Sequence, residues 1–168
     1  MFAFHVERKE AFRVIGFKTV LEGGTGIHSP EYSGQKTAFF KSKVENGQMA
    51  QLRPYAESPL GIAVVAAENG RCCYYAGVIS SRPLPGGTGE VHFPAGEVLV
   101  LSGSGGLSRL AFDRLEDYAF GTLFNVGLAH DGAAYEYTGG PVAEILLNGN
   151  PADAEVEVWI PVRKREGR

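Results

Sequence analysis

The stretch Glu155–Val162 constrains the fold of this chain more than any other. Its sequence is Glu-Val-Glu-Val-Trp-Ile-Pro-Val, and this alternation predicts a β-strand, whose successive side chains point to opposite faces. The four aliphatic side chains share one face, which belongs in a core. The other face carries Glu157 and Trp159, the only tryptophan of the chain. This pairing predicts the wall of an apolar cavity that holds a fixed negative charge, although a Trp that closes a sheet edge beside an exposed Glu gives the same pattern.

The first half of the chain predicts a strand, a helix and a hairpin. β-Branched and aromatic runs bounded by glycines indicate strands, and Asn46-Gly47 is a helix stop. The helix is expected to turn Ala38, Phe39 and Phe40 toward the core. The predicted elements are a strand over 11–22, a helix over about 35–45, a short helical turn over 48–52, and strands over 62–67 and 71–80. Residues 1–6 are expected to form an extended arm.

The second half repeats this order after a Pro- and Gly-rich linker over 81–89. Its elements are a strand over 90–102 with a bend at 94–96, a helix over 107–125, strands over 142–147 and 155–162, and a short strand over 135–137. Each half is therefore strand, helix, strand, strand, which predicts an internal repeat with halves 11–81 and 90–163. We expect residues 1–168 to form one α+β domain, in which the two halves join their sheets and leave a ligand cleft between them.

Composition excludes several classes of function. The net charge is −3 and the basic residues are scattered, which argues against direct DNA binding. No apolar run approaches the length of about 20 residues that a spanning helix needs, so we expect no membrane insertion. The only cysteines, Cys72 and Cys73, are adjacent, so in a strand they point apart and cannot easily form a disulfide. Together with the lack of a signal peptide, this predicts a protein of the reducing cytoplasm.

Motifs for metal, phosphate or nucleophile chemistry are missing from the sequence. The four His are far apart, without metal-ligand spacing. The glycine-rich stretch 102–106 lacks the Gly-Lys-Ser/Thr ending of a phosphate loop and predicts a tight turn. No Gly-x-Ser-x-Gly elbow is present. We therefore expect no metal and no cofactor, and no residue is a firm catalytic candidate.

Five segments resemble the GyrI-like small-molecule-binding domain, which is also the effector-binding domain of some AraC-type and MerR-type transcription activators. They are Arg71–Val78, Pro94–Val100, the helix after the glycine-rich turn, Val142–Asn148 and Glu157–Val162. The resemblance covers about residues 12–162. It implies two strand–helix–strand–strand units that form a curved antiparallel sheet around a central ligand pocket. No helix-turn-helix segment precedes it, so a stand-alone domain is expected.

The resemblance also implies which residues line the pocket. Members that sense lipophilic cations have an aromatic pocket with buried carboxylate, and the matching positions here are Glu144, Glu157 and Trp159. The two glutamates are expected to share one cavity, with Tyr75 favoured over Tyr74 as a further wall residue. Many members have a Tyr where this chain has Val98, so a hydroxyl expected near the pocket is missing.

The favoured function is non-covalent binding of a small lipophilic organic molecule, cations included, in an effector-binding or multidrug-binding role. Two alternatives stay open. Some stand-alone members resemble hydrolases of electrophilic, cyclopropane-bearing toxins, for which Glu157 or Glu144 would be the general base. The gyrase inhibitors that give the family its name are protein-interaction modules, so gyrase or a transcription regulator is an alternative partner. A net charge of −3 is mild for DNA mimicry.

Overall fold

Strands and helices follow one another in the order that the sequence predicts, with two additions. The computed structural model describes residues 2–166, so residues 1, 167 and 168 of the predicted domain lie outside the described part. The strands are β1 (Ala3–Lys9), β2 (Phe12–Leu21), β3 (Gly61–Glu68), β4 (Arg71–Ile79), β5 (Gly89–Phe93), β6 (Gly96–Ser104), β7 (Leu128–His130), β8 (Ala133–Tyr137), β9 (Val142–Leu146) and β10 (Glu155–Lys164). The additions are β1, where an extended arm was expected, and β7.

The helical residues lie in two segments of the chain, one between β2 and β3 and the other between β6 and β7. The helices are α1 (Ser33–Glu45), α2 (Gln48–Leu52), α3 (Ser108–Tyr118) and α4 (Phe124–Val126), with 3-10 helices at Pro30–Tyr32 and Arg53–Tyr55 and a π-helix at Ala119–Leu123. The predicted helix 107–125 is therefore one helical run whose hydrogen bonding changes near its middle. No helix of residues 2–166 is long and apolar enough to cross a membrane.

The strands form one antiparallel sheet in the order β1-β6-β10-β9-β3-β4-β2-β5, and β8 extends it beside β10. The order from β6 to β9 mirrors the order from β2 to β3, so each predicted half contributes its strands in the same sequence. This arrangement is the one expected of two strand–helix–strand–strand units. The internal repeat itself stays a prediction.

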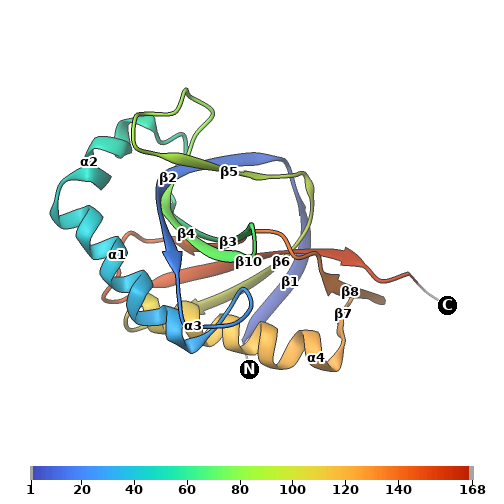
Figure 1. Ribbon diagram of the computed structural model, residues 1–168. Helices are drawn as coiled ribbons and strands as arrows, with labels where there is room; N and C mark the ends of the chain where they lie inside the picture. Colours follow the sequence, from blue (N-terminus) through green and yellow to red (C-terminus); the bar gives the residue numbers. More distant parts are fainter. Residues whose placement is uncertain (1, 167–168) are drawn as a thin grey trace.

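The connection between β1 and β2 requires the sheet to curl. These strands are six steps apart in the sheet, about 29 Å if the sheet were flat. Only Glu10 and Ala11 join them, and three Cα steps span at most about 11 Å. Pro94 and Ala95 likewise join the edge strand β5 to β6 near the other edge. The strands therefore form the ring in Figure 1, with β2 and β5 above and β6 and β10 below, while the helices lie outside it.

Glycines permit the close approach of strands where the ring bends. Gly16 is in register with Gly77 of β4 and Gly89 of β5. A Cβ atom on Gly77 would lie 2.0 Å from the carbonyl oxygen of Ile15, which no other residue type tolerates. The Cβ of any larger residue at Gly16 would lie 2.5 Å from the carbonyl oxygen of Ala76.

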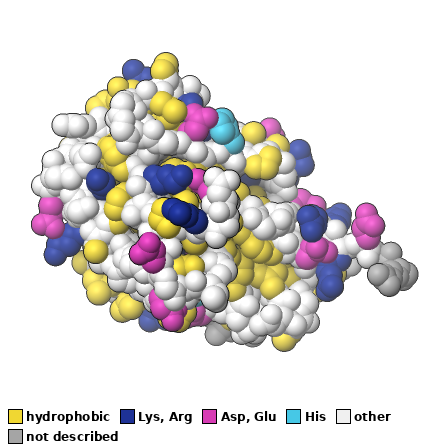
Figure 2. All heavy atoms as spheres, in the orientation of Figure 1, with side chains coloured by type: hydrophobic (Ala, Val, Ile, Leu, Met, Phe, Trp, Pro, Cys, Tyr) yellow, Lys and Arg dark blue, Asp and Glu magenta, His cyan; other side chains and the backbone are white. Residues whose placement is uncertain are grey.

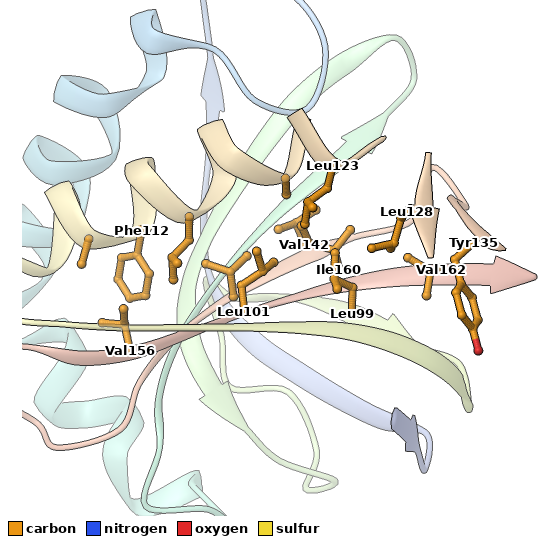
Figure 3. Packing of buried hydrophobic residues seen from close by; sticks show 14 of the residues in the cluster. Leu99, Leu101, Phe112, Leu123, Leu128, Tyr135, Val142, Val156, Ile160 and Val162 are labelled. Carbon is orange, nitrogen blue, oxygen red and sulfur yellow. The ribbon is translucent and has the colours of Figure 1, made fainter. Parts of the chain in front are cut away.

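The two faces of the sheet hold separate apolar clusters. On the outer face, Phe112 and Leu115 of α3 pack against Leu101 and the aliphatic residues of β10 (Figure 3). The prediction that Val156, Val158, Ile160 and Val162 share a core face is confirmed. The inner face holds a second cluster that includes Val14, Val64, Tyr75, Val100, Ile145 and Trp159. In the view of Figure 2, side chains fill the ring of strands.

The helix faces differ in detail from the sequence prediction. Phe39 packs against the sheet as expected, but Ala38 is exposed and the most buried residue of α1 is Lys36. At the start of α3, Leu107 and Leu110 are exposed, although the periodicity assigns them to the buried stripe. A buried lysine needs a partner charge, and the outer face of the sheet provides it.

Candidate functional site

Trp159 and Glu157 lie side by side on the inner face of β10. Side chains at positions i and i+2 of a strand point to the same face. This face of β10 is on the inside of the ring, so both side chains project into it. The indole Nε1 of Trp159 donates a hydrogen bond of 2.9 Å to Oε1 of Glu157. The predicted pairing of these two side chains on one face is confirmed. Trp159 is only 8% exposed, while Glu157 is partly exposed.

Two phenylalanines complete an aromatic wall beside the indole. The ring of Phe12 meets that of Trp159 edge-on, with 5.8 Å between centroids and an interplanar angle of 85°. Phe12 also stacks on Phe93, with centroids 4.4 Å apart and planes 8° from parallel. No sequence pattern predicted a site role for either residue. Phe12 begins β2 and Phe93 ends β5, and these strands reach Trp159 only because the sheet curls.

A cleft of about 230 Å³ opens beside this aromatic wall. Its lining is mostly apolar and comes from the turn between β5 and β6, the loop before β9, and the end of β10. The lining residues are Lys9, Phe12, Phe93, Pro94, Ala95, Gly96, Glu97, Val98, Thr138, Gly140, Pro141, Trp159, Pro161 and Val162. Val98, where the resemblance leads us to expect a Tyr hydroxyl, therefore lies in the cleft. The Glu97 carboxylate accepts a hydrogen bond of 3.1 Å from the Tyr135 hydroxyl.

Lys9 places a positive charge on the indole. Its Nζ lies 4.0 Å from the centroid of the Trp159 ring, within the range of a cation–π interaction. The nearest carboxylate oxygen to this ammonium belongs to Glu7, at 3.6 Å. A 2.7 Å hydrogen bond with His5 lowers the pKa of the Glu7 carboxyl. The cleft thus combines a mostly apolar lining with one carboxylate, Glu97, and one lysine, while Glu157 lies behind it, bonded to the lining residue Trp159.

Tyr75 lies on the same inner face as Trp159, at a different place. It is buried, and its hydroxyl donates a 2.5 Å hydrogen bond to Oε2 of Glu68, whose Oε1 pairs with Nζ of Lys18 at 2.6 Å. Burial raises the pKa of Tyr75 to about 12. Tyr75 belongs to the inner-face cluster and Tyr74 packs on the outer face, while the preference for Tyr75 as a wall residue of the ligand pocket stays a prediction. Tyr75 is not part of the cleft lining.

Glu144 lies on the opposite face from Glu157, so the prediction that both share one cavity is wrong. The register of the two strands pairs Glu157 with Ile145 and Glu144 with Val158. Residues opposite each other in an antiparallel pair point to the same face. Glu144 therefore points with Val158 toward the helices. Glu144 and Glu157 are 13 residues apart in the sequence. This spacing alone does not show whether they share a face, because the register depends on the length of the turn between β9 and β10.

Two cations from different helices hold the buried carboxylate of Glu144. Arg109 of α3 binds it through both ends of its guanidinium, with Nη1 at 2.9 Å from Oε1 and Nη2 at 2.5 Å from Oε2. Nζ of Lys36 lies 3.0 Å from Oε2. Burial alone would raise the pKa of Glu144, but the charges of Arg109 and Lys36 hold it well below its usual range. Glu144 is 1% exposed and joins both helices to the sheet.

A second buried carboxylate, Glu116, completes this ion cluster. Lys36 lies 3.6 Å and Arg109 3.5 Å from its oxygens, and Nδ1 of His28 lies 3.7 Å away. Within residues 2–166, neither carboxylate oxygen of Glu116 has a hydrogen-bond partner. Burial and the nearby negative charge of Glu144 raise the pKa of Glu116 to about 7. We call these five residues, Lys36, Arg109, Glu116, Glu144 and His28, the outer-face ion cluster.

The described residues offer no metal centre: across 2–166, no three or more His, Cys, Asp or Glu side chains gather in a way that could hold a metal ion. The free thiols of Cys72 and Cys73 are buried on opposite faces of β4. The chemistry of the inner face is therefore that of an aromatic and apolar cleft with fixed charges.

Comparison with known proteins gives one family and several similar folds. The family model described as Cass2, integron-associated effector binding protein, matches residues 5–162. No curated protein matches the sequence. Structure comparison finds SAV2435 bound to tetraphenylphosphonium, with a TM-score of 0.75 and 14% sequence identity over 96% of this chain and 94% of that chain.

Two further structures have the same fold at similarly low sequence identity. An integron cassette protein from the mobile metagenome of Vibrio cholerae has a TM-score of 0.62 and 13% identity, over 96% of this chain and 97% of that chain. The C-terminal domain of EcmrR has a TM-score of 0.63 and 11% identity, over 98% of this chain and 99% of that chain. These similarities show that the curled α+β sheet is a shared architecture.

Proposed function

Because this chain belongs to the family of integron-associated effector binding proteins, we propose that it binds a small lipophilic molecule, cations included, in the cleft beside Trp159. The family and the fold confirm the resemblance to a GyrI-like effector-binding domain. The observation that carries the proposal is the pair of Glu157 and Trp159, a carboxylate bonded to a buried indole on an apolar wall. SAV2435, which has the same fold, has been seen with the lipophilic cation tetraphenylphosphonium.

The binding energy would come from apolar burial, with charge providing selectivity. Burial of apolar surface contributes roughly 25 cal/mol per Å² before the costs of association. The rings of Phe12, Phe93 and Trp159 contribute to that surface together with the other apolar residues of the lining. Glu157 provides a negative charge whose only hydrogen-bond partner within residues 2–166 is the indole N–H, so its attraction remains available to a ligand cation.

We propose binding rather than hydrolysis because of the residue at position 98. Many members of the family that the chain resembles have a Tyr here, and this cleft has the aliphatic side chain of Val98 instead, so it lacks a hydroxyl for chemistry that needs one. Glu157 would act as an anchor for charge and not as a general base. Tyr75 remains a predicted contact for a ligand long enough to extend along the inner face.

Two ions of the same shape and opposite charge test this proposal. Tetraphenylphosphonium and tetraphenylborate are titrated into the wild-type protein, followed by Trp159 fluorescence and by calorimetry. We expect the cation to bind, and the Glu157→Gln variant to bind it about ten- to thirtyfold more weakly, the loss expected for two charges about 8–12 Å apart at an effective dielectric constant near 20.

Glu155→Gln is the matched control, since Glu155 lies two residues away on the same face of β10 and is exposed. It should change the affinity for the cation by less than about twofold. Absence of binding for both ions, or an equal loss in the two variants, would contradict the proposed site.

A further inference from the structure

Lys9 occupies the position on the indole that a ligand cation would take. We propose that Lys9 is a resident cation, which a cationic ligand displaces from the face of Trp159, and that Lys9 thereby sets the affinity of the cleft for cations. This inference rests on the proposed function, and it adds a specificity-determining residue to the site. No feature of the sequence around Lys9, Val-Glu-Arg-Lys-Glu, indicates such a role.

The placement of Lys9 shows that the contact is built into the fold. Lys9 is the last residue of β1, and Trp159 lies on β10, with β6 between them in the sheet. The lysine stem must cross β6 to bring Nζ to 4.0 Å from the indole centroid. The side chain is 22% exposed, so its stem also covers part of the inner face.

The ammonium has little else to hold it. Within residues 2–166, the only carboxylate within 4.0 Å of Nζ is that of Glu7, at 3.6 Å, and Nζ makes no hydrogen bond. A lysine that served only to stabilise the fold would be expected to pair closely, as Lys18 does with Glu68 at 2.6 Å on the same inner face. Lys9 is therefore held chiefly by the indole ring, and a second cation can compete with it for that ring.

A ligand cation and the Lys9 ammonium cannot share the indole. Trp159 is 8% exposed, its N–H is bonded to Glu157, and Phe12 packs against it edge-on, so the ring offers little further surface. Two like charges at this distance repel each other. Entry of a cation therefore requires the Lys9 ammonium to leave the indole ring. The nearby Glu7 carboxylate can then pair with this ammonium.

The proposal is tested by removing the charge of Lys9 while keeping its length. The Lys9→Met variant should bind tetraphenylphosphonium about tenfold more tightly than the wild type, because no resident cation competes for the ring. The same variant should bind tetraphenylborate more weakly, since an anion loses the attraction of the ammonium. Lys9→Arg, which keeps a cation that stacks on aromatic rings, should bind the phosphonium no more tightly than the wild type.

Lys18→Met is the matched control. Lys18 lies on the same inner face, but its Nζ is 5.7 Å from the Tyr75 ring and it pairs with Glu68. The control loses one positive charge without touching Trp159, so it should change both affinities by less than about twofold. An equal gain in both methionine variants would overturn the proposal, because it would indicate only a change in net charge.

Displacement itself has a direct signature. In the free protein the ring current of Trp159 should shift the side-chain methylene protons of Lys9 upfield, and these signals are assigned by their loss in Lys9→Met. Saturation with tetraphenylphosphonium should return them to the range of an exposed lysine. Signals that stay upfield in the saturated complex would overturn displacement.

The outcomes separate this inference from the proposed function. Equal binding of the phosphonium by wild type and Lys9→Met overturns the role of Lys9 and leaves the proposed function standing. No binding by either protein overturns both. Binding by Lys9→Met with none by the wild type supports the role of Lys9 and overturns the proposed binding of this cation by the wild-type protein.

Discussion

Two glutamates on the two faces of one sheet have opposite surroundings. Glu144 on the outer face is bound by Arg109 and Lys36 and is 1% exposed. Glu157 on the inner face is partly exposed and accepts one hydrogen bond, from the indole of Trp159. Sequence treats the two alike, because both stand among aliphatic residues in a strand. The difference teaches that a carboxylate paired with buried cations is structural, whereas the charge of Glu157 is the one that we propose to be available to a ligand.

The outer-face ion cluster has a structural role because its charges compensate one another. A buried charge without a partner is costly, so the guanidinium and ammonium that meet Glu144 also require it. The cluster connects α1 and α3 to the sheet, and the helices reach it from both halves of the chain. The inner face has no such closed set around Glu157. We therefore expect its carboxylate to contribute little to folding, which fits the proposed role of attracting a ligand cation.

The same substitution on each face tests this contrast, and it has the largest expected effect. Glu144→Gln leaves Arg109 and Lys36 buried without a full countercharge, so the free energy of unfolding should fall by about 3–5 kcal/mol. Glu157→Gln keeps the shape of a partly exposed side chain and an oxygen that can accept the indole hydrogen bond, so it should change the free energy of unfolding by less than about 0.5 kcal/mol. Urea unfolding followed by circular dichroism measures both. Equal losses would show that the two faces do not differ in the way proposed.

The pH dependence of stability gives a second test of the contrast between the two faces. The pKa of Glu116 is raised to about 7 by burial and by Glu144, so its proton is held more tightly in the folded than in the unfolded chain. Stability from this group is complete below about pH 4.5 and is lost as the pH rises through 7. One pKa unit corresponds to about 1.4 kcal/mol, so a rise from 4.5 to about 7 corresponds to a loss of roughly 3–4 kcal/mol.

His28 acts in the same direction. Burial opposes its protonation, but the carboxylates of Glu116 and Asp117 outweigh this and raise the pKa of His28. Its contribution is present below the unfolded pKa near 6.5 and is lost as the pH rises through the folded value. The lowered pKa of Glu144 acts in the opposite direction, and only as the pH falls below about 4.5. Stability should therefore decline between about pH 5 and pH 8.

Glu116→Gln isolates the contribution of the carboxylate. The variant should lose most of the decline in the unfolding free energy between pH 5 and pH 8, measured by urea unfolding at each pH, while Glu157→Gln should keep it. A decline that persists in full in Glu116→Gln would assign the pH dependence to His28 or to groups outside the cluster.

The sequence predicts the strands of the fold well because their signals are local. The alternation in Glu155–Val162 and the turn Glu68-Asn69-Gly70 both correspond to observed elements, β10 and the hairpin of β3 and β4. Strand β1 was missed because its hydrogen-bond partner is β6, about ninety residues away in the chain. A short apolar stretch has no pattern that identifies such a distant partner.

The site could be predicted only in part, for the same physical reason. Glu157 and Trp159 are two residues apart on one strand, so local alternation places them together. The side of Glu144 could not be predicted, because the residues around it in Val142–Leu146 are apolar on both faces and the register with β10 decides. Phe12 reaches Trp159 through the curl of the whole sheet, and Lys9 reaches it across β6, and no local pattern records either contact.

The smallest expected effect concerns the extent of the inner-face site. Tyr75→Phe removes the 2.5 Å hydrogen bond to Glu68, and Lys18 still pairs with that carboxylate. The free energy of unfolding should fall by about 1 kcal/mol, the usual net contribution of one hydrogen bond. Because Tyr75 is buried outside the lining of the cleft, the affinity for tetraphenylphosphonium should stay within about twofold of the wild-type value. A tenfold weaker affinity, measured by calorimetry at unchanged stability, would instead show that the ligand extends from Trp159 along the inner face to Tyr75. The contrast between the two faces would then apply to the whole inner surface of the ring.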